Sequence, residues 1–191
     1  MKKKFKENKT VSKSFNSSSL FIRYGLILLF GLFNLSLFYF IFTSLTVYSV
    51  YFILNLFFEP FLSGTTIFLG EISLEIIPAC VGGSAYYLLF ILNLSIPNLL
   101  VRKRLKMIFS SSLFLLILNV LRIVFLSLLA YNDSSYFDLT HKIFWYLLST
   151  VFVIGIWFWE VTYFKIKEIP LYSDLKELYS KSIFKQKKKL N

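Results

Sequence analysis

The sequence predicts an all-α integral membrane helical bundle of about four to six membrane helices, with a small extracytoplasmic extended or hairpin element. Three observations predict this fold class. The chain of 191 residues is 57% hydrophobic and only 16% charged, so a soluble domain of this size could not cover its apolar surface with polar groups. Its apolar runs are long and nearly free of charge, as a lipid environment requires. One polar segment with the alternation of a β-strand separates the early apolar runs from the later ones.

The N-terminal region predicts a basic tail followed by a membrane anchor. Residues 1–19 are rich in lysine and serine, and we expect a flexible cytoplasmic tail there. The first spanning helix is predicted over Leu20–Phe42, as a retained signal anchor, because no convincing small-residue cleavage site follows it. The next apolar run, Val47–Phe58, is short for a crossing and ends at Glu59-Pro60, which favours a re-entrant or interfacial segment.

The segment 63–76 has a different pattern. Polar and apolar side chains alternate over residues 71–76, which is typical of a strand with one buried face, and Gly70-Glu71 is a candidate hairpin turn. Open strands cannot face hydrocarbon, because their unpaired backbone groups would find no hydrogen-bond partners there. We therefore place this extended element outside the lipid, just before the helix that carries Cys80.

The remaining apolar runs predict three further membrane helices. Proline suits the first turn of a helix, which favours a helix start at Pro78. The three predicted helices are Pro78–Leu100, Met107–Tyr131 and Thr140–Phe164. We thus divide the chain into a transmembrane domain over residues 20–164 and a basic cytoplasmic tail over residues 165–191.

The distribution of positive charge predicts the orientation of these helices. All but two of the 21 Lys and Arg residues lie near the N-terminus, in the loop 102–106, or after residue 164. Cytoplasmic loops carry the excess of Lys and Arg in membrane proteins, so these segments are predicted to be cytoplasmic. The segments 43–79 and 131–140 contain no Lys or Arg and are predicted to face outside. This orientation needs four full crossings and a non-crossing 47–58 segment.

The net charge of +11 would suggest a nucleic-acid partner in a soluble protein. Here the charges flank lipid-spanning segments, where they set the topology or meet anionic headgroups. We therefore expect no nucleic-acid partner.

Arg122 and Lys142 are the two basic residues outside these segments. Arg122 lies within an apolar helix, where an arginine costs roughly 2.5–3.5 kcal/mol and needs a partner or a cavity. Its side chain could instead extend toward the membrane interface. Asn119 lies three residues earlier on the same helical face, which indicates a polar site or an interhelical hydrogen bond. Lys142 is most simply an interfacial lysine.

Cys80 and His141 are the only cysteine and the only histidine. A single cysteine excludes an intrachain disulfide and leaves either a small apolar packing residue or a reactive thiol. His141 begins the last predicted helix, where a capping or interfacial role is the alternative to a catalytic one. One Cys and one His offer too few good ligands for a metal site, so no metal or other cofactor is expected.

Together, Cys80, Arg122 and His141 are predicted to lie toward the outer leaflet on three successive helices. A thiolate is the nucleophilic form of cysteine, and a nearby guanidinium or imidazolium favours that anion. Histidine can accept the thiol proton and later protonate a leaving amine. Arginine can hold a developing oxyanion. These are the residue types that peptide-bond chemistry by a thiol requires.

Two motifs in this region resemble those of the exosortase/archaeosortase family. The segment 78–84 (Pro-Ala-Cys-Val-Gly-Gly-Ser) resembles the nucleophile motif, in which small residues follow a cysteine at the start of a membrane helix. The segment 119–123 (Asn-Val-Leu-Arg-Ile) resembles the Asn-x-x-Arg motif, and His141 stands where the family has its third residue. The resemblance covers about residues 60–160 and is greatest to short archaeal members. It departs at Val81, where the family commonly has serine or threonine.

The resemblance implies a membrane cysteine protease and transpeptidase. Such proteins recognise substrate proteins with a C-terminal motif, a hydrophobic helix and a basic end, and transfer them to an acceptor such as a membrane lipid. By this resemblance Cys80 forms a thioester, His141 acts as general acid and base, Arg122 stabilises the thiolate or oxyanion, and Asn119 supports Arg122. The active site is expected at the outer face of the plasma membrane.

Two other functional classes remain as alternatives from the sequence alone. The first is a non-catalytic polytopic membrane scaffold or a protein that binds sorting signals without cutting them. The second is a serine intramembrane protease, which is less favoured although Ser84 follows Gly83.

Overall fold

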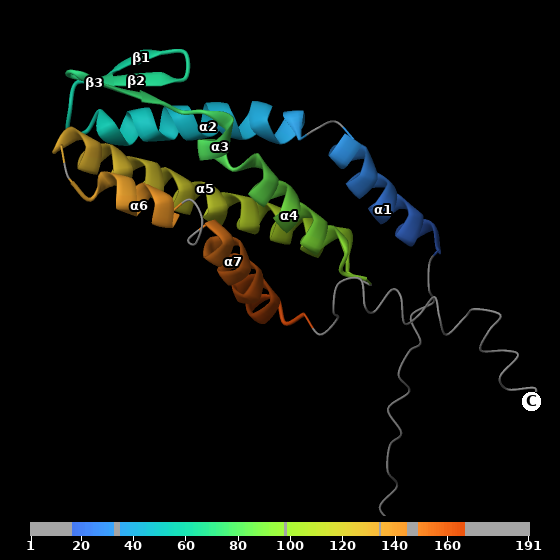
Figure 1. Cartoon of the computed structure of the whole chain (residues 1–191). Helices are drawn as coiled ribbons and strands as arrows, with labels where there is room; N and C mark the ends of the chain where they lie inside the picture. The colour runs from blue at the N-terminus through green and yellow to red at the C-terminus, as the bar shows by residue number, and fades with distance from the viewer. Residues whose placement is uncertain (1–16, 33–34, 98, 134, 145–148, 167–191) are drawn as a thin grey trace, which may run out of the picture.

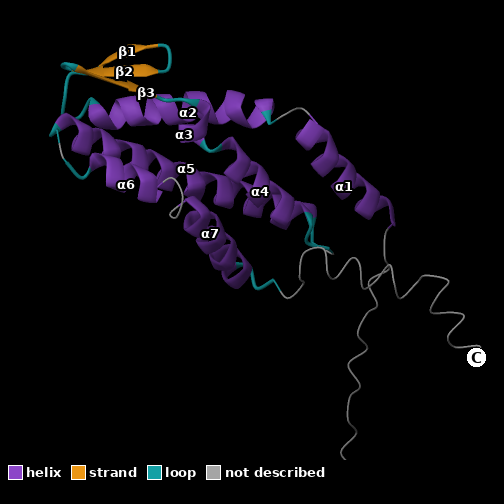
Figure 2. Cartoon of the chain, viewed as in Figure 1, coloured by secondary structure: helices purple, strands orange, loops and turns teal. Residues whose placement is uncertain are grey.

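The computed structural model describes residues 17–32, 35–97, 99–133, 135–144 and 149–166. These residues form helices α1 to α7 and one small sheet at one end of the helical assembly (Figures 1 and 2). Most of the predicted tails, 1–19 and 165–191, lies outside the described residues.

The predicted first helix is in fact two helices. α1 spans Ser17–Leu32 and α2 spans Ser36–Leu54, so the prediction of one helix over Leu20–Phe42 is wrong. Leu35 precedes α2 with a φ of 59°, a left-handed conformation that interrupts regular helical hydrogen bonding. The run Val47–Phe58 is likewise no separate re-entrant segment, because α2 continues through most of it.

The predicted extended element is confirmed and has three strands. β1 spans Phe61–Ser63, β2 spans Thr66–Leu69 and β3 spans Ile72–Glu75, paired antiparallel in the order β1-β2-β3. The turn between β2 and β3 lies at the predicted position, where Gly70 has a φ of 61° that favours glycine. Its position outside the membrane stays a prediction.

The sheet packs on the helices through one face. Ile67 and Leu69 of β2 are buried in a cluster with Val50 and Leu54 of α2. Burial of this face fixes the strand register, because a shift of one residue would move these side chains to the solvent face. The sheet is thereby held against α2 (Figure 1).

The predicted helix Pro78–Leu100 is broken near its start. α3 spans Pro78–Val81 and α4 spans Gly83–Leu94, with Gly82 between them at a φ of 74°. A residue with a Cβ is strained in that left-handed conformation, so glycine permits the break. The chain consequently enters α4 with a sharp change of direction (Figure 2).

Gly83 lets α4 approach α2 closely. A Cβ at this position would lie 2.7 Å from Cε1 of Tyr39, whose ring packs against the core beneath the sheet. We expect Gly83→Ala to destabilise the protein by about 1–3 kcal/mol, because an overpacked core must shift. Thermal unfolding in detergent, followed by circular dichroism, measures this loss.

Gly155→Ala is the matched control for that prediction. Gly155 also lies in a helix, but a Cβ there would meet nothing within 4 Å. Its replacement should leave the melting temperature unchanged or raise it, because alanine favours a helix over glycine. Equal melting temperatures for both variants would contradict a close contact at Gly83.

The longest helix crosses the whole assembly. α5 spans Val101–Tyr131, 31 residues, so the predicted helix Met107–Tyr131 is present but begins six residues earlier. The basic segment 102–106 is therefore the first part of α5 rather than a loop. Arg104 donates hydrogen bonds to the carbonyls of Leu94 and Ile96, at distances of 2.6 and 2.8 Å.

The predicted last helix, Thr140–Phe164, is described in two parts. α6 spans Phe137–Ile143 and α7 spans Ser149–Tyr163. Residues 145–148, between them, lie outside the described residues. His141 lies on α6.

A buried carboxyl group links three helices. Glu160 of α7 accepts hydrogen bonds from Nδ2 of Asn93 in α4, at 3.0 Å, and from Oγ of Ser110 in α5, at 2.9 Å. Asn93 also donates to Ser111, at 3.2 Å. Glu160 is fully buried, and such a group is tolerated only when its hydrogen bonds are made.

The helices carry a surface suited to lipid. Many large apolar side chains point outward, among them Phe40, Phe52, Phe109 and Phe158. Among the described helices, α2 and α5 are long and apolar enough to cross a membrane, and α1, α4 and α7 are shorter but also apolar. The predicted number of four to six crossings stays a prediction.

Candidate active site

Local sequence places Cys80 on a single helical turn between the sheet and α4. Pro78 occupies the first turn of α3, where its missing N–H leaves no hydrogen bond unmade. Gly82 ends the helix after four residues. The N–H of Cys80 donates to the carbonyl of Ile77, at 2.8 Å, so the cysteine follows β3 almost directly. Its side chain is half-buried.

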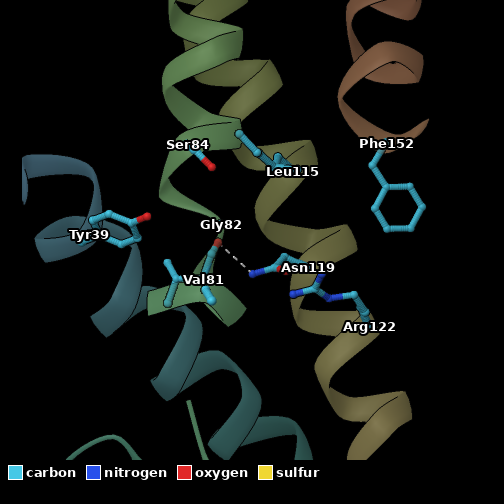
Figure 3. Close-up of a pocket in the computed structure, with 10 residues that line it drawn as sticks. Tyr39, Val81, Gly82, Ser84, Leu115, Asn119, Arg122 and Phe152 are labelled. Carbon is cyan, nitrogen blue, oxygen red and sulfur yellow. Dashed lines mark hydrogen bonds between the residues drawn. The ribbon is translucent and has the colours of Figure 1, made fainter. Parts of the chain in front are cut away.

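Asn119 and Arg122 of α5 hold the main chain of this turn. Nδ2 of Asn119 donates to the carbonyls of Cys80, at 3.0 Å, and Val81, at 3.1 Å. Arg122 Nη2 donates to the Cys80 carbonyl, at 2.9 Å. Figure 3 shows Asn119 reaching from α5 to this backbone. The last carbonyls of a helix lack partners within it, so α5 completes the hydrogen bonding of α3.

These hydrogen bonds give Asn119 a more direct place in the site than the sequence predicted. The resemblance implied that Asn119 supports Arg122, whereas both of its hydrogen bonds go to the backbone at Cys80 and Val81. Asn119 and Arg122 share this task because they lie one helical turn apart on the same face of α5.

His141 approaches the same region from α6. It is half-exposed, and its ring stacks on that of Phe137, with centroids 5.8 Å apart and an angle of 16° between the planes. Residues four apart are neighbours on a helix surface, so α6 itself brings the two rings together. The stack limits the orientations open to the imidazole.

The three predicted catalytic residues line one cavity. It has a volume of about 270 Å³ and is lined by Cys80 of α3, Arg122 of α5 and His141 of α6. Residues of β3, α5 and α6, with those that directly follow β3 and α6, complete the lining. They are Ser73, Leu74, Glu75, Ile76, Ile77, Ile123, Leu126, Ser127, Phe137 and Phe144. A thiol, a guanidinium and an imidazole around one cavity are the groups that thiol-dependent acyl transfer requires.

A second cavity, of about 320 Å³, also has Arg122 in its lining. Its other lining residues include Tyr39, Ser84, Asn119 and Phe152 (Figure 3). Arg122 therefore lines both cavities. The cavities and the hydrogen bond to the Cys80 carbonyl account for an arginine within an apolar helix, because they give the guanidinium open space and a polar partner in place of lipid.

Several residues near the site were not predicted from the sequence. Tyr86 of α4 is buried near Arg122, but no sequence signal distinguishes it from the other tyrosines of the chain. The four-residue spacing between Phe137 and His141 was a sequence signal that the two rings are neighbours on one helix. Ser73 and Glu75 also had one, the alternation that predicted their strand.

The described residues contain no group of three or more His, Cys, Asp or Glu side chains that could hold a metal ion.

Comparison with known proteins gives one match. The family model of the transmembrane exosortases matches residues 15–158, which include Cys80, Asn119, Arg122 and His141. No curated protein and no solved structure matches the chain. The match covers most of the sequence, all the described helices except the end of α7, and every residue of the cavity. This chain is a membrane protein that belongs to the transmembrane exosortase family.

Proposed function

We propose that this protein is a cysteine protease and transpeptidase of the membrane, which cleaves C-terminal sorting signals and transfers the cleaved protein to an acceptor. The observation that carries the proposal is the single cavity lined by Cys80, Arg122 and His141, in a chain of the exosortase family. Its substrates are proteins that end in a short motif, a hydrophobic helix and basic residues. A membrane lipid is one acceptor that fits this setting.

The first step forms a thioester. His141 accepts the proton of the Cys80 thiol, and the thiolate attacks the carbonyl carbon of the scissile peptide bond. The tetrahedral intermediate collapses when the C–N bond breaks, and His141 returns the proton to the departing amine. The N-terminal part of the substrate remains on Cys80, and the apolar tail with its basic end leaves.

The second step transfers the acyl group. A hydroxyl or amine of the acceptor attacks the thioester carbonyl, and His141 accepts the proton that this nucleophile loses. The Cys80 thiolate then departs. Water in place of the acceptor would give simple hydrolysis by the same route.

Arg122 is suited to charge stabilisation in both steps. A guanidinium offers several fixed donors, so one N–H can hold the Cys80 carbonyl while others face the thiolate or the oxyanion. Asn119 positions the nucleophile by holding the backbone at Cys80 and Val81. Val81 replaces the usual hydroxyl residue, and this proposal gives its side chain no chemical role.

The proposed setting is the outer face of the plasma membrane. The basic residues at the start of α5 and in the tails favour a cytoplasmic location for those segments. The sheet with its turns and α6 carry the acidic residues Glu71, Glu75 and Asp138. Their basic residues are Lys142 and His141. The proposal therefore places the cavity near the outer ends of the helices, where a lipid headgroup can reach it.

Trapping the thioester tests the proposed function. Membranes that hold the protein and the proteome of its own cell are quenched in acid, and the protein is purified and weighed by mass spectrometry. We expect an adduct on Cys80 that neutral hydroxylamine removes, because hydroxylamine cleaves thioesters readily. Since the chain has one cysteine, the site of attachment is unambiguous.

The Cys80→Ser variant provides the matched control. Any adduct that it forms is an ester, which should resist the same hydroxylamine treatment. A protein that binds sorting signals without cutting them would co-purify with intact substrates and carry no adduct, and this outcome would replace the enzyme by the non-catalytic alternative.

A further inference from the structure

β3 is an edge strand whose outer side is open. The sheet has the order β1-β2-β3, so β3 pairs with β2 on one side only. The N–H of Ile76 donates to the carbonyl of the directly opposite residue, Thr65, at 3.0 Å. Opposite residues in antiparallel strands alternate between hydrogen-bonded and non-hydrogen-bonded pairs. This one bond therefore sets the pattern for the whole strand.

The pattern leaves two residues with backbone groups on the open side. Ile72, Leu74 and Ile76 direct their N–H and C=O groups toward β2. Ser73 and Glu75, opposite Phe68 and Thr66 respectively, direct theirs away from it. Within the described residues, no hydrogen bond from another segment occupies these outward groups of Ser73 and Glu75.

The open edge forms one wall of the catalytic cavity. Ser73 and Glu75 line the same cavity as Cys80 and His141. Residues of α5 and α6 form other parts of the wall of this cavity. β3 leads within five residues to Cys80. An edge strand beside a nucleophile is a template for an incoming peptide, because it offers unpaired donors and acceptors at intervals of about 7 Å.

We propose that the recognition segment of the substrate binds in extended form as a fourth strand along β3, paired with the backbone of Ser73 and Glu75. This proposal rests on the proposed function and adds how the substrate reaches the nucleophile. Pairing would straighten the peptide and hold its scissile carbonyl toward Cys80. Main-chain pairing supplies affinity for any sequence, and the side chains that point into the cavity supply selectivity.

A second copy of this chain is a less suitable occupant of the edge. The edge faces the cavity that Cys80, Arg122 and His141 also line, and these are groups that act on a peptide bond but serve no purpose in pairing with a second sheet. The opposite edge, at β1, lines none of the cavity that holds Cys80. The peptide is therefore the occupant that fits the chemistry.

Proline substitution tests the pairing directly. Proline removes a backbone N–H and blocks strand addition, yet it is tolerated at an edge position whose N–H faces away from the sheet. We expect Ser73→Pro and Glu75→Pro each to slow thioester formation on Cys80 by about tenfold or more. Each variant loses one backbone hydrogen bond to the substrate, and the proline ring disturbs the neighbouring strand pairing. The probe is a reporter protein fused to the C-terminal tail of a substrate trapped on Cys80.

Three control variants accompany the proline variants. Ser73→Ala and Glu75→Gln keep the backbone donors, so each should slow thioester formation less than the proline variant at the same position, which separates loss of the N–H from loss of the side chain. Leu62→Pro removes the outward N–H of β1, because Leu62 lies opposite Ile67 in a pair without hydrogen bonds. It should leave thioester formation nearly unchanged. In every variant, alkylation of Cys80 by N-ethylmaleimide at the wild-type rate shows that the nucleophile is intact.

Wild-type rates in both proline variants would overturn the strand-addition proposal and leave the proposed function standing. No thioester in the wild-type protein would instead defeat the proposed function, and this proposal with it. If the proline variants fail to accumulate, photo-cross-linking tests the strand-addition proposal instead, with benzoylphenylalanine incorporated at position 73. It should cross-link to the reporter fusion, whereas the same group at the exposed Ser63 of β1 should not. Equal cross-linking from both edges, or none from position 73, would also overturn the proposal.

Discussion

Replacing Cys80 with alanine should abolish processing of the sorting signal, slowing it by roughly 10⁴-fold or more, because removal of a covalent nucleophile leaves only binding and charge stabilisation. The measurement is the half-life of a tail-bearing substrate in membranes, followed by the loss of its C-terminal segment on a gel. Membrane insertion and the amount of protein should equal those of the wild type, since the Cys80 side chain is small and half-buried.

Ser84→Ala is the matched control for the nucleophile. Ser84 lies four residues from Cys80 and lines the second cavity, so it is the hydroxyl that a serine protease at this place would use. Under the proposed mechanism Ser84→Ala processes its substrate at close to the wild-type rate. Continued processing by Cys80→Ala, with loss of processing in Ser84→Ala, would show that the reaction takes place at Ser84 in the second cavity. This result would refute the thioester mechanism.

Replacing Arg122 with lysine should slow processing by about 10²–10³-fold, the usual effect of losing one donor from an oxyanion site. Lysine keeps the positive charge, but its single ammonium cannot hold the Cys80 carbonyl and also face the reacting atoms. The alkylation rate of Cys80 by iodoacetamide, measured at neutral pH in the same membranes, should also fall. This second readout detects the loss of thiolate, which a purely structural role of Arg122 would not predict.

Arg104→Lys is the control for this arginine. Arg104 also holds backbone carbonyls, those of Leu94 and Ile96, but it lies at the opposite end of α5 from the cavity. Its replacement can lower stability by the loss of hydrogen bonds, about 1 kcal/mol each, without slowing processing. Equal losses of processing in both arginine variants, with equal losses of melting temperature, would show that Arg122 acts through stability alone.

The site couples the nucleophile to α5 through backbone as well as side chain. Asn119 and Arg122 bind the last carbonyls of α3, so the single helical turn that carries Cys80 depends on α5 for its hydrogen bonds. The Cys80 side chain is thereby held in the lining of the cavity to which β3 and His141 also contribute. A nucleophile on so short a helix could not hold its position alone, because an isolated turn is unstable in itself.

Elements marked by a clear pattern of polar and apolar residues were predictable from the sequence. The alternation over residues 71–76 predicted β3 and its turn, because a sheet with one buried face requires a period of two. The long apolar run before Tyr131, with Arg122 as its one charged residue, predicted most of α5. The rarity of arginine in such a run, together with a single cysteine and a single histidine, was enough to select Arg122, Cys80 and His141.

The breaks between helices could not be predicted in the same way. The interruption at Leu35, before α2, falls within a stretch that is apolar on both sides. In lipid the outer face and the core are equally apolar, so no change of polarity marks the end of a helix. The break at Gly82 had a residue that permits it, but glycine also occurs within membrane helices and by itself predicts no break.

The sequence by itself predicted a helical membrane fold, the family and the three candidate catalytic residues, because composition and ordered motifs depend on residue type alone. Only the tertiary structure decided that Cys80, Arg122 and His141 line one cavity, that Asn119 holds the cysteine backbone, and that the edge of β3 opens beside them. These relations join segments far apart in the chain through packing between α3, α5 and α6. That packing depends on shape and close contact, and one-dimensional patterns of polarity do not record it.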